Sequence, residues 1–488
     1  MAVPEASTRA EVSTGARSTH GGSRDRPGEA SPRWILVAAV LGSGAVFLEG
    51  TVVNVAMPAI GREFSLAMSG LQWVMNAYLL SLTALMLLGG SLGDRYGRAS
   101  VFQGGALGFA VATAACAVAP GPLALYLARS IQGAAGAMLV PNSLAMLGDA
   151  YSGEERSVAI GRWAAWSAVS TAVGPLLGGS LADASSWRWV FAVVIPFALV
   201  AAWMARRHRA ACVADEGRRH IPVDYGGAAL VSLGLAGVVT GLIAGPGTGF
   251  GHPAVLAPLG LGTLMLAWFG LLEAHKASPL LPLDVFRSRQ FTGTNLTTLL
   301  VYASLSGLFF LLMLELQNGL GYGALAAGAS LLPVNVLMLA FSPRMGRLAE
   351  RIGPRWPMTV GAAVAALGML LFARVRPASD YLSVVLPATV VFGLGLSMLV
   401  TPLTSAALGA VGEGRKGLAS GLNNAVARLA GLLATASIPV AAGLGGLEEV
   451  RGEALTRGFV RAMWICAALC VLGSLVAWWT VDDHRRRS

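Results

Sequence analysis

Two charged side chains lie deep inside apolar stretches of the sequence and could together handle a proton. Glu49 follows about 15 residues of the run 34–55, which places it roughly 22 Å along a helix, and Arg129 reaches a similar depth from the opposite face in the run 123–147. A charge inside a membrane span costs several kcal/mol unless it has a partner or a use. Burial disfavours an ionised carboxyl, whereas a nearby cation favours it. We hypothesise that Glu49 carries a transported proton and that Arg129 tunes it; the alternative is a permanent ion pair that braces two helices.

Further polar and aromatic side chains inside apolar runs could line a substrate cavity. Arg428 would lie near the midplane of its span, where it could contact a substrate or a backbone carbonyl. Glu315 would lie near the outer end of its span, where we expect solvent exposure, with proton coupling as the alternative. Apart from Arg428, each candidate taken alone is more often a packing residue between helices. The cavity candidates are Asn54, Asn76, Gln132, Trp163, Trp166, Gln317, Asn423, Asn424 and Arg428.

The elements that must position these residues are membrane-spanning helices. The chain has 488 residues, of which 55% are hydrophobic and 12% charged, against about 25% charged in a soluble domain. Only helices satisfy the backbone of such apolar runs in lipid, so the sequence predicts an all-α membrane protein. The predicted spans are 34–55, 71–91, 100–118, 123–147, 158–182, 189–205, 226–244, 255–272, 292–314, 324–342, 358–374, 382–408, 418–443 and 459–480.

The loop charges predict an even number of spans with both termini in the cytoplasm. Alternate loops, among them the one with Arg95 and Arg98, hold most of the arginines, whereas the opposite loops hold few. The net charge of +10 is scattered without a basic stripe, which excludes nucleic-acid binding. All six histidines lie in predicted tails or loops, so the sequence predicts no metal site.

A sequence motif that occurs twice indicates how the helices are organised. The stretch from Gly90 to Arg98 resembles the stretch from Gly346 to Gly353, 256 residues later, which corresponds to about eight helices with their loops. Two six-helix halves would be offset by six helices, so two further helices lie between them. The predicted organisation is a cytoplasmic tail 1–33, a six-helix bundle 34–205, a loop 206–225, two additional helices 226–272, a loop 273–291, a second six-helix bundle 292–480 and a tail 481–488.

Several motifs in this order resemble the drug:proton antiporter branch of the major facilitator superfamily with fourteen transmembrane helices. They are the stretch from Leu48 to Pro58, the loop with Gly90, Asp94, Arg95, Gly97 and Arg98, the stretch from Arg129 to Gly136, and the helix with Gly161, Gly174, Pro175, Gly178 and Gly179. The resemblance implies proton coupling at Glu49 and Arg129, a conformational latch in the loop, and an antiporter motif in the glycine-rich helix. From the residues alone, Asp94 would cap the third span, Gly93 and Gly97 would permit a tight turn, and the other glycines would permit close helix packing.

The resemblance therefore implies a proton-coupled exporter of small hydrophobic compounds, such as an antibiotic or a toxic metabolite. The chain would be a monomer in the inner (plasma) membrane, without a cofactor and driven by the proton gradient. Proton-coupled uptake of a small metabolite is the first alternative, and a non-transporting membrane enzyme or sensor is the second. The lack of a phosphate loop argues against a nucleotide-driven pump, and the lack of a nucleophile with a base argues against an enzyme.

Overall fold

The computed structural model describes residues 32–209, 223–276, 283–411 and 416–483, and within these ranges every regular element is a helix. In chain order they are α1 (Pro32–Glu63), α2 (Met68–Tyr96), α3 (Arg98–Ala117), α4 (Pro122–Ala150), α5 (Gly153–Ala184), α6 (Arg188–Ala192), α7 (Ile195–Arg209), α8 (Tyr225–Thr248), α9 (Pro253–His275), η2 (Leu283–Arg287), α10 (Arg289–Leu314), η3 (Glu315–Gly319), α11 (Ala324–Ala329), α12 (Leu332–Ile352), α13 (Arg355–Phe372), η4 (Tyr381–Val385), α14 (Leu386–Gly409), α15 (Lys416–Ala441) and α16 (Gly452–Thr480).

To within two residues at its ends, every predicted span lies on one of these helices or on a pair of them. Thirteen helical stretches of the described chain are long and apolar enough to cross a membrane, and α5, which covers the predicted span 158–182, is the more polar fourteenth. Two spans are broken: α6 gives way to α7 just before Pro196, and α11 gives way to α12 just before Pro333. Proline lacks a backbone N–H and fits the first turn of a new helix, which accounts for both breaks.

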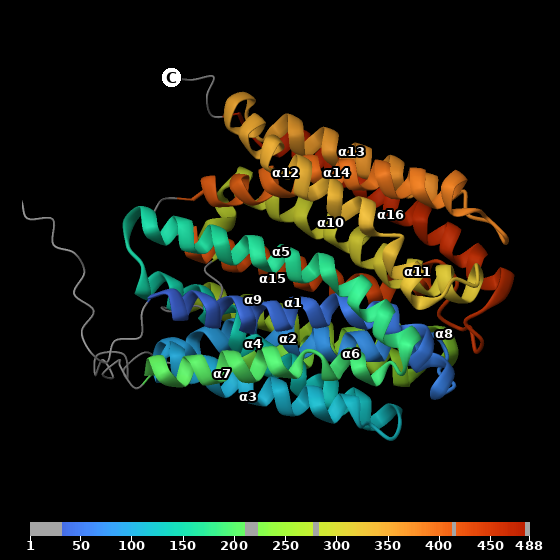
Figure 1. Cartoon of the computed structure of the whole chain (residues 1–488), viewed down its shortest axis with the longest axis horizontal. Coiled ribbons are helices and arrows are strands. Elements are labelled where there is room, and N and C mark those ends of the chain that lie inside the picture. The colour runs from blue at the N-terminus through green and yellow to red at the C-terminus, as the bar shows by residue number, and fades with distance from the viewer. Residues whose placement is uncertain (1–31, 210–222, 277–282, 412–415, 484–488) are drawn as a thin grey trace, which may run out of the picture.

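The helices form two groups joined by a third pair. In the first group α2 packs against α4, α3 against α4 and α7, and α1 against α5; in the second, α13 packs against α14 and α16, and α10 against α15 and α16. The remaining pair, α8 and α9, packs together, and α8 also contacts α2 and α15, so it touches both groups (Figure 1). The closest approach in this pair is at Gly237 and Gly262, where an added Cβ would lie 3.0 Å or less from the facing backbone.

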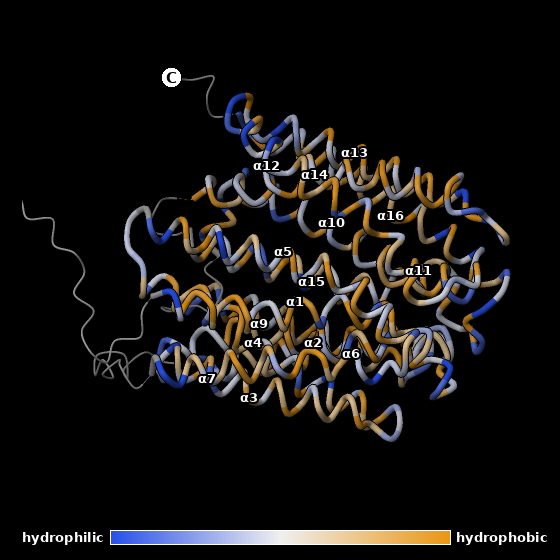
Figure 2. Tube along the Cα trace, in the orientation of Figure 1, coloured by the Kyte–Doolittle hydropathy of each residue, from blue (hydrophilic) through white to orange (hydrophobic). Residues whose placement is uncertain are grey.

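Hydropathy divides the molecule along its long axis. Figure 2 shows hydrophilic residues gathered at the two ends and apolar residues along the helices between them. The first turn of α1 and the last turn of α16 lie at the same end (Figure 1). We call this the inner end and the opposite one the outer end. An even number of membrane crossings follows from this arrangement.

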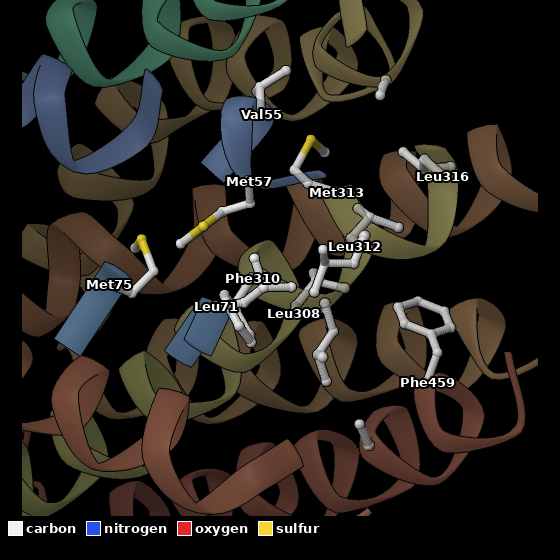
Figure 3. Close-up of a cluster of buried hydrophobic side chains, with 14 of the residues drawn as sticks. Val55, Met57, Leu71, Met75, Leu308, Phe310, Leu312, Met313, Leu316 and Phe459 are labelled. Atoms are coloured by element: carbon white, nitrogen blue, oxygen red, sulfur yellow. The ribbon is translucent and has the colours of Figure 1, made fainter. Parts of the chain in front are cut away.

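The two halves meet closely at the outer end. Gly179 of α5 packs against Ala324 of α11, and the carboxylate of Asp183 accepts hydrogen bonds from the N–H groups of Ala324 (2.9 Å) and Leu325 (2.8 Å). The amide of Gln317 donates to the carbonyl of Val55 in α1 at 2.9 Å. We call these contacts the outer seam. Figure 3 shows the apolar cluster beside it, in which Val55 and Met57 of α1 face Leu308 to Leu316 of α10 and η3.

Towards the inner end α5 of the first half separates from α12 of the second. Among the described residues, the innermost hydrogen bond between α5 and α12 joins Asn335 to the carbonyl of Ala172 (3.0 Å). Farther inward the ribbons of α5 and α12 diverge (Figure 1). The structure is therefore closed at the outer end.

A charged cluster ties α8 to α9 at the inner end. Lys276 pairs with Asp224 and with Glu273, the latter at 3.0 Å, and the N–H of Gly227 also donates to Asp224. Burial opposes the charge on Asp224, but the bonds from Lys276 and Gly227 prevail and hold the pKa of this carboxyl below its ordinary value.

Replacing Lys276 with alanine is expected to lower the stability of the α8–α9 pair modestly, by about 1 kcal/mol, because the ion pair is partly solvated. A depressed carboxyl pKa stabilises the fold above the ordinary pKa of 3.8 and loses that contribution as the pH falls through the folded-state value. The difference between wild type and Lys276→Ala in thermal unfolding in detergent should therefore persist at neutral pH and vanish at strongly acidic pH. An unchanged difference across that range would contradict this assignment.

Candidate functional site

A fully buried ion pair occupies the interior of the first half. The guanidinium of Arg129 donates to a carboxylate oxygen of Glu49 at 2.7 Å, and neither side chain has any exposed surface. The two residues come from α1 and α4, which pack against each other. From the rise per residue of a helix, the sequence analysis placed these two charges at a similar depth. In the structure they lie at that depth in direct contact.

Three further contacts hold Arg129, although its Nη2 has no hydrogen-bond partner in the described protein. Its Nη1 also donates to Gln132 at 2.6 Å and its Nε donates to the carbonyl of Val74 at 3.2 Å. The ring of Tyr78 lies 4.3 Å from the guanidinium carbon. Oε2 of Glu49 likewise has no hydrogen-bond partner in the described protein. The cation is fixed, while the carboxylate keeps one oxygen available for a proton.

Gln132 belongs to this network and not to a cavity wall. It accepts from Arg129 and donates from Nε2 to Thr113 at 2.8 Å, and it is fully buried. The interpretation of Gln132 as a cavity residue is therefore corrected: its amide fixes the cation that faces Glu49.

A small cavity lies between the two halves. The residues that α1 contributes to it follow Glu49 closely in the sequence. Its volume is about 60 Å³, and α1, α5, α10 and α12 all contribute to its wall. Among the predicted cavity residues Asn54 lines it, together with Pro175 of the glycine-rich helix. The other lining residues are Thr51, Val55, Thr171, Phe309, Met313, Leu331, Val334 and Asn335. A drug-sized molecule needs several hundred Å³, so the halves must move apart to admit one.

The glycine-rich helix α5 packs closely on both neighbours. A Cβ on Gly174 would lie 2.0 Å from Thr51, and one on Gly178 would lie 2.8 Å from the carbonyl of Val52, both in α1. A Cβ on Gly179 would meet α11 across the outer seam, whereas one on Gly161 would meet nothing within 4 Å. Three of the four glycines thus permit close approach, and Gly161 does not.

The predicted latch joins the inner ends of α2, α3 and α4. Arg98 donates to Asp94 at 2.9 Å and to Asp149 at 2.6 Å. Gly97 has φ 91°, a left-handed value that suits glycine and turns the chain from α2 into α3. Gly90 lies inside α2. Arg95 also lies in the last turn of α2, where it stacks on the ring of Tyr96.

Two expectations for this loop were wrong. Asp94 lies within α2 and does not cap α3, whose first turn follows Gly97 without a side-chain cap. The carboxylate instead forms the ion pair with Arg98. Gly93 lies inside α2 and not in a turn; it accommodates the side chain of Asn142, whose Oδ1 would lie 1.7 Å from an added Cβ.

A family model described as Major Facilitator Superfamily matches residues 39–435. The chain belongs to this superfamily. A puromycin resistance protein from Streptomyces alboniger is 33% identical over 469 residues, covering 92% of each chain. A tetracenomycin C resistance and export protein from Streptomyces glaucescens is 31% identical, covering 89% of this chain and 79% of the relative. A cephamycin export protein from Amycolatopsis lactamdurans is 33% identical, covering 84% and 85%.

Solved structures with this superfamily's architecture share the fold at much lower identity. A crystal structure of a D-xylose-proton symporter superposes with a TM-score of 0.63 at 15% identity, covering 94% of this chain and all of the other. A POT family peptide transporter gives a TM-score of 0.62 at 15% identity, covering 93% and 99%. The similarity to named resistance and export proteins agrees with the drug-export branch that the motifs indicated.

The two copies of the repeated motif have the same local structure in the two halves. Gly97 follows α2 with φ 91°, and Gly353 follows α12 with φ 92°. Each glycine ends the second long helix of its half and begins the turn into the next. The two stretches therefore occupy equivalent places.

Most of the remaining cavity candidates bond to neighbouring helices. Asn76 accepts from Thr435 of α15 at 2.5 Å, and Asn423 donates to Asn295 and Thr298 of α10. Gln317 belongs to the outer seam. Asn424 donates to the carbonyl of Ser420 in its own helix. These contacts are packing interactions within and between the halves.

Two aromatic candidates and one cation lie nearer the inner end. Trp163 is buried and donates to Ser43, while Trp166 is exposed. Arg428 of α15 lies 5.0 Å from the ring of Phe47 in α1, so it spans the two halves by a cation–π contact. None of the three lines the small cavity.

Glu315 is not exposed, contrary to expectation. It begins the π-helical turn η3 at the outer end of α10 and has no accessible surface. Because α10 continues without a break into η3, the carboxyl is kept inside the bundle instead of entering the outer loop. Thr456 of α16 donates to its Oε1 at 2.7 Å.

Proposed function

We propose that this chain is a proton-driven exporter of small, mainly hydrophobic organic compounds, such as an antibiotic or another toxic metabolite. The single observation that carries the proton coupling is the buried pair of Glu49 and Arg129, with one oxygen of Glu49 left unbonded. The direction is supported by the relatives whose names describe antibiotic resistance and export.

The proposed cycle is alternating access, in which the two halves rock about the site between them. Substrate enters from the inner end, where α5 and α12 are apart, and leaves after the outer seam opens. A proton from outside binds Glu49 and leaves to the inside in the opposite phase. When the proton has left, Arg129 forms an ion pair with the carboxylate of Glu49. When the proton is bound, Arg129 has no counter-charge, so protonation weakens the interaction between α1 and α4.

The protein would work in the plasma membrane with its inner end in the cytoplasm. The inner end holds the arginine-rich loops, which the positive-inside rule places there. The proposal includes a monomer, no cofactor and no enzymatic activity, with the proton gradient as the energy source.

Inverted membrane vesicles from a drug-sensitive host test this function. We expect vesicles with the protein to accumulate ethidium when their interior is acidified and to lose it when an ionophore collapses the pH gradient. Vesicles without the protein provide the background. Accumulation by intact cells instead of depletion would support uptake, and dye movement that is indifferent to the pH gradient would reject proton coupling.

A further inference from the structure

Glu315 marks a second place where a proton could act in the cycle. We propose that it is a proton-binding site that controls closure of the outer seam, which rests on the proposed proton-driven function. The seam closes when an external proton occupies Glu315 and is held open when the carboxylate is charged. The ligand is a hydrogen ion taken from the outer solution.

The surroundings of Glu315 suit a neutral carboxyl group. Its side chain is fully buried; Thr456 bonds one oxygen at 2.7 Å, and the other oxygen has no hydrogen-bond partner in the described protein. Gly319 lies against it, since an added Cβ there would be 2.6 Å from the carboxyl carbon. A charged carboxylate in such a place is strongly disfavoured, whereas the protonated form is tolerated far better.

No cation within the described chain forms an ion pair with Glu315, in contrast to Glu49 and its partner Arg129. Charged and titratable groups on the elements around it have other contacts: Arg62 of α1 bonds Asn318, and Arg457 pairs with Glu453 of α16 at 3.0 Å. The α11 helix carries no titratable side chain. The other such groups near this end, on the loops beside it and on α16, are Tyr322, Glu448, Glu449, Arg451 and Arg461.

The residues that follow Glu315 in the same turn hold the two halves together. Gln317 donates to the carbonyl of Val55 in α1, and the side-chain oxygen of Asn318 accepts from Arg62 of α1 at 3.5 Å. Leu316 packs in the cluster that Figure 3 shows beside Met313. Because η3 is one short turn, a change that moves Glu315 also moves the groups that close the seam.

The consequence is a gate that senses outside pH. When the outer end opens, Glu315 gains access to water and can ionise. It must take up a proton again before η3 can return to its buried place. Because this proton is lost to the outer solution on opening and regained from it on closing, Glu315 gates the seam without adding to the protons that cross the membrane.

Cysteine labelling tests the gate without any substrate. Ala324 lies at the seam and is 7% exposed, so Ala324→Cys in a chain with Cys212→Ser should react with a membrane-impermeant maleimide only when the seam opens. In right-side-out vesicles we expect labelling to fall about tenfold as the outside pH drops through the range in which Glu315 titrates. Leu382→Cys, at an exposed outer position, corrects for the pH dependence of the maleimide reaction itself.

Replacing Glu315 with glutamine should abolish this pH dependence and keep labelling low throughout, because the amide mimics the protonated group. Thr456→Val should shift the labelling midpoint upward by up to about one pH unit, because it removes a donor to the charged form. The matched control is Glu453→Gln, which removes an exposed carboxyl from α16, the helix that carries Thr456. It should leave the midpoint unchanged.

Unaltered pH dependence in Glu315→Gln, or no pH dependence in the parent, would overturn the proposal. Those outcomes are independent of transport, since the assay needs no substrate. Failure of the exporter function would appear instead as dye accumulation that does not depend on the pH gradient. That outcome is separate from the result of the labelling experiment.

Discussion

Replacing Glu49 with glutamine is expected to reduce proton-driven dye accumulation to the background of vesicles without the protein. The amide oxygen can still accept a hydrogen bond from Arg129, so α1 and α4 remain tied, but the side chain can no longer gain or lose a proton. The measurement is ethidium transport in inverted vesicles under an imposed pH gradient, normalised to the amount of protein in the membrane.

Exchange of labelled for unlabelled substrate without a pH gradient separates the proton role from a bracing role. If Glu49 carries the proton, Glu49→Gln should retain exchange while net transport is lost. A permanent brace would instead show itself as loss of both, with lower stability, because removing one partner of a buried ion pair costs about 3–5 kcal/mol. Glu49→Asp keeps the carboxyl and should retain part of the net transport.

A double variant controls for the unpaired cation. Glu49→Gln leaves Arg129 buried without a counter-charge, which could impair folding independently of coupling. Glu49→Gln combined with Arg129→Gln removes both charges and should restore stability without restoring proton-driven transport. Recovery of net transport in the double variant would show that the carboxyl of Glu49 is dispensable.

The membrane fold could be predicted because backbone chemistry in lipid leaves one solution for each long apolar run. The same rule, combined with a fixed rise per residue, put Glu49 and Arg129 at one depth. Depth is a distance along the helix axis, which sequence position gives directly. The breaks before Pro196 and Pro333 were missed although each proline signals one.

Rotation about the helix axis could not be predicted in the same way. Helices such as α10 are apolar around most of their surface, so the hydropathy pattern does not indicate which face lines the cavity. Asn76 and Gln132 were therefore assigned to a cavity, although each bonds a neighbouring helix or side chain.

The lining residues that the sequence did not reveal fall into two kinds. Asn335 is a polar residue inside an apolar run and could have been selected by the same rule as Asn54. Phe309 and Met313 are ordinary apolar residues whose role depends on which helix faces them, so the sequence contains no signal for them. Glu315 was misplaced for a related reason: its closeness to the end of a span said nothing about the π-helical turn that buries it.

Replacing Gly179 with alanine is expected to cost the transporter most of its net efflux by preventing closure of the outer seam. A Cβ at this position would lie 2.5 Å from the carbonyl oxygen of Ala324 and 2.7 Å from the Cα of Leu325, and backbone atoms cannot rotate away. Overpacking of this kind costs about 1–3 kcal/mol, which moves an equilibrium between two states by roughly 5- to 150-fold. Efflux should fall by a similar factor.

Gly161→Ala provides the matched control on the same helix. No atom lies within 4 Å of its added Cβ, and the gain in helix propensity is the same at both positions. We therefore expect normal efflux from Gly161→Ala and normal membrane levels of both variants. Normal efflux from Gly179→Ala would show that the outer seam need not close as tightly as this structure has it. Equal loss from both variants would show that α5 must remain flexible along its length, since only added stiffness is common to the two.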